Sequence, residues 1–109
     1  MSKKVKIVTY VPLENADVVR EALGKAGAGK IGEYSFCSFS IVGKGRFLPS
    51  QNANPHIGHS GAMESIDEER IEVECARDKA KAVIKAMKNA HPYEEVAFDI
   101  YPLLTEEEL

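Results

Sequence analysis

Three side chains that can move protons or bind a metal follow one another closely in the last fifth of the chain. His91 titrates near neutral pH, and the carboxylates of Glu94 and Glu95 come shortly after it, so together they could form a ligand site or a proton-transfer site. A structural interpretation fits the same segment. His91 would complement a helix dipole, Pro92 would end the helix, and Tyr93 would pack before a strand begins. Both interpretations stay open.

The other two histidines, His56 and His59, could bind a divalent metal such as zinc. Imidazole suits zinc, copper and nickel, and a third ligand would come from Glu64, His91 or a neighbouring subunit. The pair lies on a predicted loop, where nothing fixes the distance between the two rings. A surface pair without a metal is therefore the alternative to a site formed by His56, His59 and His91.

Gly43, Gly45 and Arg46 offer backbone N–H groups and a guanidinium, which could form an anion site. The segment is not a P-loop, because the Gly-Lys-Ser/Thr motif is missing, and it is not a dinucleotide fingerprint. In the alternative interpretation the glycines only turn the chain out of a strand. Cys37 and Cys75 fall in predicted strands and are expected to be reduced, buried thiols.

Several of these candidates lie in a polar segment, residues 43–61, that shows neither helical nor strand periodicity. Connections in compact domains are usually about 4–6 residues long, and much longer ones are functional or disordered. Phe47, Leu48 and Ile57 are atypical of a solvated tether, so we expect them to anchor an ordered loop against a neighbouring subunit. The predicted ligand-binding residues are Arg46, Phe47, Asn54, His91, Tyr93, Glu94 and Glu95.

Length and charge exclude several classes of protein. A chain of 109 residues corresponds to a single domain, here ending in an acidic tail at residues 105–109. The net charge of −3 gives no electrostatic basis for binding nucleic acid or an anionic membrane. No stretch approaches the ~20 apolar residues of a membrane span, and the first residues lack a signal-peptide pattern, so we expect a cytoplasmic protein.

Apolar periodicity predicts four strands and two helices. The strands are expected at residues 5–11, 34–42, 70–75 and 96–101. One helix is expected between an Asn15 cap and a Gly27 stop, and the other between an Asp78 cap and His91. The order β-α-β-β-α-β predicts an α+β, ferredoxin-like sandwich with a long connection between the second and third strands.

This order predicts one covered and one open sheet face, because right-handed crossovers place both helices on the same face. The other face would carry Lys6, Val8, Tyr10, Arg70, Glu72 and Glu74. A face of such mixed character is either solvated or covered by neighbouring subunits with its charges paired.

Several separate motifs in a fixed order resemble one family. They are the segments Gly27–Tyr34, Gly43–Pro49, Asn54–Gly58 and His91–Glu95. Together they resemble the PII-like and CutA-like domain that is inserted in YqfO-type members of the YbgI, or Nif-three-like, family. The resemblance covers residues 4–103. Asn52 and Val96 depart from the family pattern, and His56 and His59 do not belong to it.

The resemblance implies a CutA- and PII-like ferredoxin fold, a homotrimer, and a stand-alone form of a domain otherwise carried in a larger protein. The larger proteins hold a dinuclear metal site whose ligands lie in flanking domains. None of those segments is in this sequence, so neither hydrolase chemistry nor a cyclohydrolase activity carries over.

We therefore expect a non-catalytic binding or regulatory module that binds a small ligand or a divalent metal at the clefts between subunits. The alternative is a small, metal-assisted enzyme of the hydrolase type that uses His91 with Glu94 or Glu95. The sequence names neither the ligand nor a partner protein.

Overall fold

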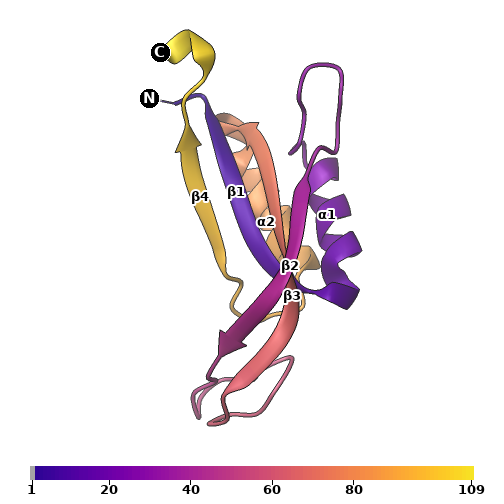
Figure 1. Ribbon diagram of the computed structural model, residues 1–109, viewed down its shortest axis with the longest axis vertical. Coiled ribbons are helices and arrows are strands. Elements are labelled where there is room, and N and C mark those ends of the chain that lie inside the picture. Colours follow the sequence, from indigo (N-terminus) through magenta and orange to yellow (C-terminus); the bar gives the residue numbers. More distant parts are fainter. Residues whose placement is uncertain (1) are drawn as a thin grey trace.

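A four-stranded antiparallel sheet with two helices on one face forms the body of the computed structural model, which describes residues 2–109 (Figure 1). The elements are β1 (Lys4–Pro12), α1 (Ala16–Lys25), β2 (Phe39–Phe47), β3 (Glu64–Ala76), α2 (Ala80–Ala90) and β4 (Phe98–Leu103). The sheet order is β2-β3-β1-β4. This is the ferredoxin-like α+β arrangement, so the predicted fold class is confirmed.

The core lies between the helices and the sheet face that they cover. Alternate residues of the two central strands supply one side, among them Ile7 and Ile71, both nearly fully buried. The helices supply the other side of the core. Each buries apolar side chains at helical spacing, among them Leu23 on α1 and Met87 on α2. Burial of each such side chain stabilises the fold by about 1.5–3 kcal/mol.

The C-terminal stop of α1 agrees with the prediction. Gly27 has a φ of 105°, the left-handed conformation that glycine adopts without a steric penalty. The N–H of Ala28 donates to the carbonyl of Leu23 at 3.0 Å, and the N–H of Gly27 donates to that of Gly24 at 3.1 Å. These two bonds form a Schellman motif and satisfy carbonyl groups at the helix end.

The predicted side-chain caps at the helix N-termini are wrong. Both helices are entered through short 3-10 turns, Leu13–Asn15 and Arg77–Lys79, and neither Asn15 nor Asp78 makes a capping hydrogen bond. Asn15 is already in a helical conformation, with φ −105° and ψ 0°, whereas a capping residue needs an extended one. The preceding turn therefore replaces the cap.

The boundaries of β2 and β3 differ from the prediction. Strand β2 begins five residues later than expected and continues to Phe47, so residues 43–47 belong to a strand and the loop spans residues 48–63. Strand β3 begins at Glu64, well before the predicted start at Arg70. The two strands extend past the helices as a hairpin (Figure 1), where no core imposes an apolar alternation. The last strand, β4, is shifted by two residues.

The helix-free face of the sheet pairs its own charges. Lys6 Nζ lies 3.3 Å from Glu72 Oε1, and Arg70 Nε donates to Glu72 Oε2 at 2.9 Å. Arg70 also donates to the hydroxyl of Tyr10 at 3.2 Å. Val8, which lies on this face opposite Glu72, is fully buried although no helix covers it. The long side chains around Val8 therefore shield it from water.

The two ends of the described chain lie side by side. Lys4 at the start of β1 is the register partner of Leu103 at the end of β4. Both lie at the end of the sheet opposite the loop between β2 and β3 (Figure 1). Within residues 2–109 no helix is long and apolar enough to cross a membrane.

The connector between α1 and β2 is fixed to the sheet through Gly29. The N–H of Gly29 donates to the carbonyl of Glu74 at 2.7 Å, and the N–H of Cys37 donates to the carbonyl of Gly29 at 2.8 Å. Gly29 has a φ of 82°, and a Cβ there would lie 2.4 Å from the carbonyl oxygen of Cys37. Only glycine fits this crossing of two backbone segments.

We predict that Gly29→Ala lowers the free energy of unfolding by about 1–3 kcal/mol, because it combines a strained φ with a backbone clash. Urea denaturation measures the change. Gly43→Ala is the matched control, since a Cβ at Gly43 meets nothing within 4 Å and its φ is not positive, and we expect a change within about 0.5 kcal/mol. Equal effects of the two substitutions would contradict this prediction.

Candidate functional site

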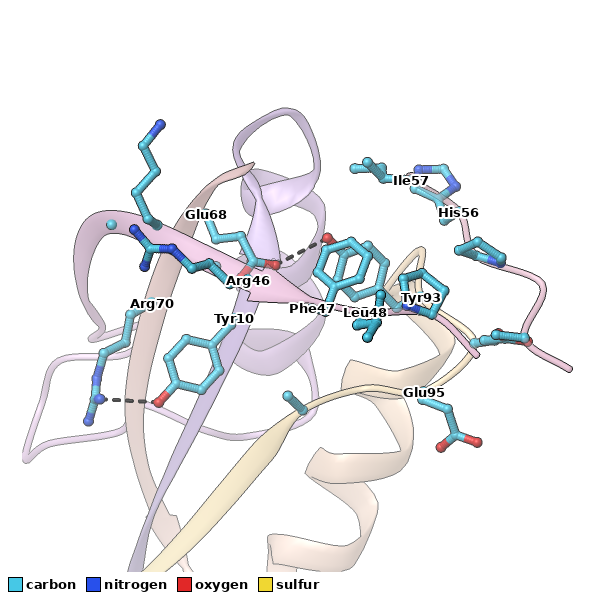
Figure 2. A pocket seen from close by; sticks show the side chains of 18 of the residues that line it. Tyr10, Arg46, Phe47, Leu48, His56, Ile57, Glu68, Arg70, Tyr93 and Glu95 are labelled. Carbon is cyan, nitrogen blue, oxygen red and sulfur yellow. Dashed lines mark hydrogen bonds between the residues drawn. The ribbon is translucent and has the colours of Figure 1, made fainter. Parts of the chain in front are cut away.

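A pocket of about 880 Å³ lies where the end of β2, the loop 48–63 and the turn after α2 meet (Figure 2). Its walls are mostly apolar, with Phe47, Leu48 and Ile57 among them, and Tyr10 and Arg70 reach it from the helix-free sheet face. This volume is within the range of pockets that hold small organic ligands, roughly 300–1,000 Å³.

The pocket brings together six of the nine residues that the sequence predicts as ligand-binding or metal-binding. They are Arg46, Phe47, His56, Tyr93, Glu94 and Glu95. The other three, Asn54, His59 and His91, are not part of its lining. Gly43 and Gly45 line it as strand residues of β2, so the expected loop of exposed N–H groups for an anion is not what the chain forms there.

Tyr93 is the centre of an aromatic cluster. Its ring lies 5.0 Å from that of His91, 6.0 Å from that of Phe47 and 6.3 Å from that of His56, measured between centroids. The rings are tilted to one another by 53–59°, a favourable arrangement for aromatic pairs. The cluster thus joins β2, the loop and the turn after α2.

The hydroxyl of Tyr93 donates a hydrogen bond of 3.1 Å to Glu68 Oε2 (Figure 2). Burial raises the pKa of Tyr93 above its ordinary value, and the nearby charge of Glu68 raises it further, so the phenol stays protonated. The other carboxylate oxygen lies against the backbone of Gly45, where a Cβ would be only 1.7 Å away. Gly45 therefore makes the space that the Glu68 carboxylate occupies.

His91 is held by hydrogen bonds at both ring nitrogens. Nδ1 accepts from the N–H of Tyr93 at 3.2 Å, so the proton is on Nε2, which donates to the carbonyl of Tyr10 at 2.6 Å. The residue is only 7% exposed, and this burial lowers the pKa of His91 below its ordinary value. As predicted, it follows directly on α2, with its N–H bonded to the carbonyl of Met87.

The loop is tied to the turn after α2 by one further contact. The backbone N–H of Asn54 donates to Glu94 Oε1 at 2.8 Å. Glu95, the next residue, makes no such bond to the loop within residues 2–109. Asn54 and Glu94 thus contact each other through the backbone amide of Asn54 and not through its side chain, and their predicted role in ligand binding stays a prediction.

The predicted metal site needs three donors close together. Across the part of the chain that the structure describes, no three His, Cys, Asp or Glu side chains gather as metal ligands. His56 lies beside Tyr93, whereas His91 has both nitrogens occupied. A metal at His56 and His59 would need donors from a second copy of the chain, and this prediction stays a prediction.

Sequence reasoning missed Glu68, Tyr10 and Arg70 as pocket residues. The sequence places Tyr10 and Arg70 on the open sheet face, but the alternation along these strands does not show that the loop 48–63 and the turn after α2 form a pocket beside them. Glu68 carried a usable signal, because it continues the alternation of Arg70 and Glu72 by one more step toward the N-terminus.

Comparison with known folds gives the structural class first. The structure of the periplasmic divalent cation tolerance protein CutA from Archaeoglobus fulgidus has a TM-score of 0.68 and 19% identity, covering 95% of this chain and 89% of that chain. The Bacillus subtilis GlnK–ATP complex gives 0.61 and 12%, covering 94% and 84%. The fold is therefore CutA-like and PII-like.

Sequence relatives define the group more closely. The chain is 53% identical over 98 residues, 90% of its length, to the Bacillus subtilis protein named GTP cyclohydrolase 1 type 2 homolog, of which it spans 26%. A Bacillus cereus protein related to NIF3 has a TM-score of 0.82 and 47% identity, covering 94% of this chain and 26% of that chain. No family model matches.

The chain is thus a homologue of one segment of these NIF3-related proteins, and the resemblance predicted from the sequence is confirmed. It spans about a quarter of the length of the curated relatives that it matches. An activity of the whole relative can therefore not be assigned to this chain from the shared segment alone.

We predict that His91 makes stability depend on pH. Because its folded pKa is below the unfolded value of about 6.5, its stabilising contribution is complete above that pH and is lost as the pH falls toward the folded pKa. The loss from this one group is at most about 1.4 kcal/mol per pH unit. Urea denaturation at several pH values between about 7.5 and 5, a range that spans the unfolded pKa, measures this loss of stability.

His91→Gln should lower the free energy of unfolding at pH 7.5 by about 1–3 kcal/mol and remove that part of the pH slope. His59→Gln, at an exposed position on the loop, is the matched control and should change neither. An unchanged slope in His91→Gln would show that another group causes it.

We also predict that Glu94→Ala exposes the Asn54 amide to exchange, because it removes the acceptor of that hydrogen bond. The bond is exposed to water, so we expect protection to fall by roughly fivefold to tenfold. Amide hydrogen exchange measured by NMR gives the value for this single group. Glu95→Ala is the control, and an equal loss of protection in both variants would argue against a specific contact.

Proposed function

We propose that this chain is a non-catalytic binding module that takes a small ligand in the pocket beside the loop 48–63. The observation that carries the proposal is the pocket itself. Residues predicted as ligand-binding from the sequence line it, and they come from separate segments of the chain. Two hydrogen bonds to carboxylates tie the turn after α2 to its neighbours: Tyr93 donates to Glu68 on β3, and the Asn54 amide in the loop donates to Glu94. A pocket built in this way is preorganised for a ligand.

The state of His91 favours binding over catalysis. The alternative, a metal-assisted enzyme of the hydrolase type, requires His91 to act with Glu94 or Glu95. His91 does not line the pocket, and each of its ring nitrogens already has a partner in the backbone. To bind a metal or accept a proton, its ring would first have to give up one of these bonds.

The name of the curated relatives does not support a cyclohydrolase activity here. The chain spans only 26% of the Bacillus subtilis relative, so an activity of the whole protein can depend on parts that this chain does not match. A small organic ligand is favoured over a metal, because the described residues of a single chain do not gather three suitable donors.

We further propose that the module works as a homotrimer whose subunits cover the helix-free face. Three large apolar residues on that face are exposed: Phe39 (63%), Ile41 (55%) and Tyr101 (42%). Strand β2 is also an edge strand, so alternate backbone groups along it have no partner in the sheet. A neighbouring subunit would satisfy both, and it would place the pocket beside the subunit boundary.

Native mass spectrometry of untagged protein tests both proposals at once, since it reports subunit number and bound species together. We expect three subunits and a retained small molecule. Phe47→Ala should weaken retention by about tenfold or more, because it removes an aromatic wall of the pocket. Tyr34→Ala, 75% exposed and outside the pocket, is the control.

A monomer at micromolar concentration would refute the trimer. Equal retention in the Phe47→Ala and Tyr34→Ala proteins would refute the pocket as the ligand site. Steady turnover of a candidate substrate by the purified protein would refute the non-catalytic assignment.

A further inference from the structure

Glu68 has an unusual position for a charged side chain. Its register partner on β2 is Gly43, and its carboxylate lies against Gly45, so the neighbouring strand presents no side chain to it. Glu68 is half-buried and accepts a hydrogen bond from Tyr93. Within residues 2–109 it makes no ion pair, as judged from the nitrogen–oxygen distances of the charged groups. A negative charge therefore enters the pocket without an ion-pair partner among the described residues.

The cationic side chains of the pocket do not neutralise Glu68. Lys44 Nζ is 2.7 Å from Asp67 Oδ1, and the guanidinium of Arg70 is bound to Glu72. Arg46 is three positions beyond Gly43 on β2, so it points to the opposite face of the strand from the one that Glu68 contacts.

The aromatic cluster around Tyr93 lies next to this carboxylate. Figure 2 shows Glu68 pointing to the hydroxyl of Tyr93, with the ring of Phe47 alongside. Phe47 shares a strand face with Gly43 and Gly45, and the ring of His56 lies 6.3 Å from that of Tyr93. The faces of aromatic rings attract cations, and a nearby carboxylate strengthens that attraction. The raised pKa of Tyr93 keeps its phenol neutral, so it adds no second negative charge.

From this arrangement we propose that the pocket binds an organic cation, an ammonium or guanidinium group carried on an apolar body. The cationic group would lie between the Glu68 carboxylate and the rings of Tyr93 and Phe47. The apolar body would extend along Leu48 and Ile57, for which the volume of about 880 Å³ leaves room. This inference rests on the proposed function, since it names the class of ligand for the same pocket.

A matched series of three probes tests the charge of the ligand at nearly constant shape. The probes are 2-phenylethylammonium, its uncharged analogue 2-phenylethanol, and the anion phenylacetate, each titrated into the whole protein by calorimetry. We expect the cation to bind at least about tenfold more tightly than the alcohol. The anion should bind more weakly than either, because Glu68 repels it.

Substitutions then assign the preference to Glu68. Glu68→Gln keeps an oxygen that can accept from Tyr93 but removes the charge, so its preference for the cation over the alcohol should fall severalfold, to what the rings alone provide. Glu74→Gln makes the same change of charge toward the far end of β3 and should behave as the wild type. Tyr93→Phe keeps the ring and should retain the preference for the cation, which provides a second variant if Glu68→Gln does not fold.

Several results would overturn the inference. Binding of 2-phenylethanol or phenylacetate as tightly as the cation would leave the pocket as a ligand site with a different ligand class. An undiminished preference for the cation in Glu68→Gln would place the cation elsewhere. If none of the probes binds while Phe47→Ala still loses a retained molecule, the inference falls and the proposed function stands. If that loss is absent too, both fall.

Discussion

The pairing of β2 with β3 beyond the helices is the interaction on which the pocket depends. Nine register pairs, from Phe39 with Glu72 to Phe47 with Glu64, hold the two strands together. A slip of one residue would exchange the faces of the strand, and Glu68 would leave the pocket side. Glu69, next to it, is held on the helix side by Arg20 at 2.8 Å, which opposes such a slip.

The sequence predicted the elements whose alternation is created by one-sided burial, and it failed where that burial stops. Ile71 and its neighbours alternate because they face the helices, so the second half of β3 was predicted correctly. Residues 64–69 carry mostly polar side chains because neither face of the hairpin meets a core there. Backbone pairing with β2 makes residues 64–69 a strand, and a pattern of apolar residues cannot predict that pairing.

About two-thirds of the site residues singled out from the sequence do line the pocket, but their partners were not predictable. Asn54 and Glu94 are 40 residues apart, and His91 and Tyr10 are 81 apart. Spacing along the chain can show that a histidine and two carboxylates are close to one another. It cannot show that a backbone carbonyl from the first strand occupies the histidine, since that depends on how the whole sheet is assembled.

The neighbouring ends of β1 and β4 have a mechanical consequence. Since Lys4 and Leu103 are register partners, a longer polypeptide would enter and leave this fold through two points about one strand spacing apart, roughly 5 Å. The fold could therefore be inserted at one position of such a polypeptide, and the two residues flanking the insertion would stay close together. The molecule is 49 Å long, and the loop 48–63, which supplies part of the pocket lining, lies at the opposite end from that junction (Figure 1). A displacement at the junction would therefore act first on the pairing of β1 with β4, and the hairpin of β2 and β3 that forms the pocket lies on the other side of the sheet order.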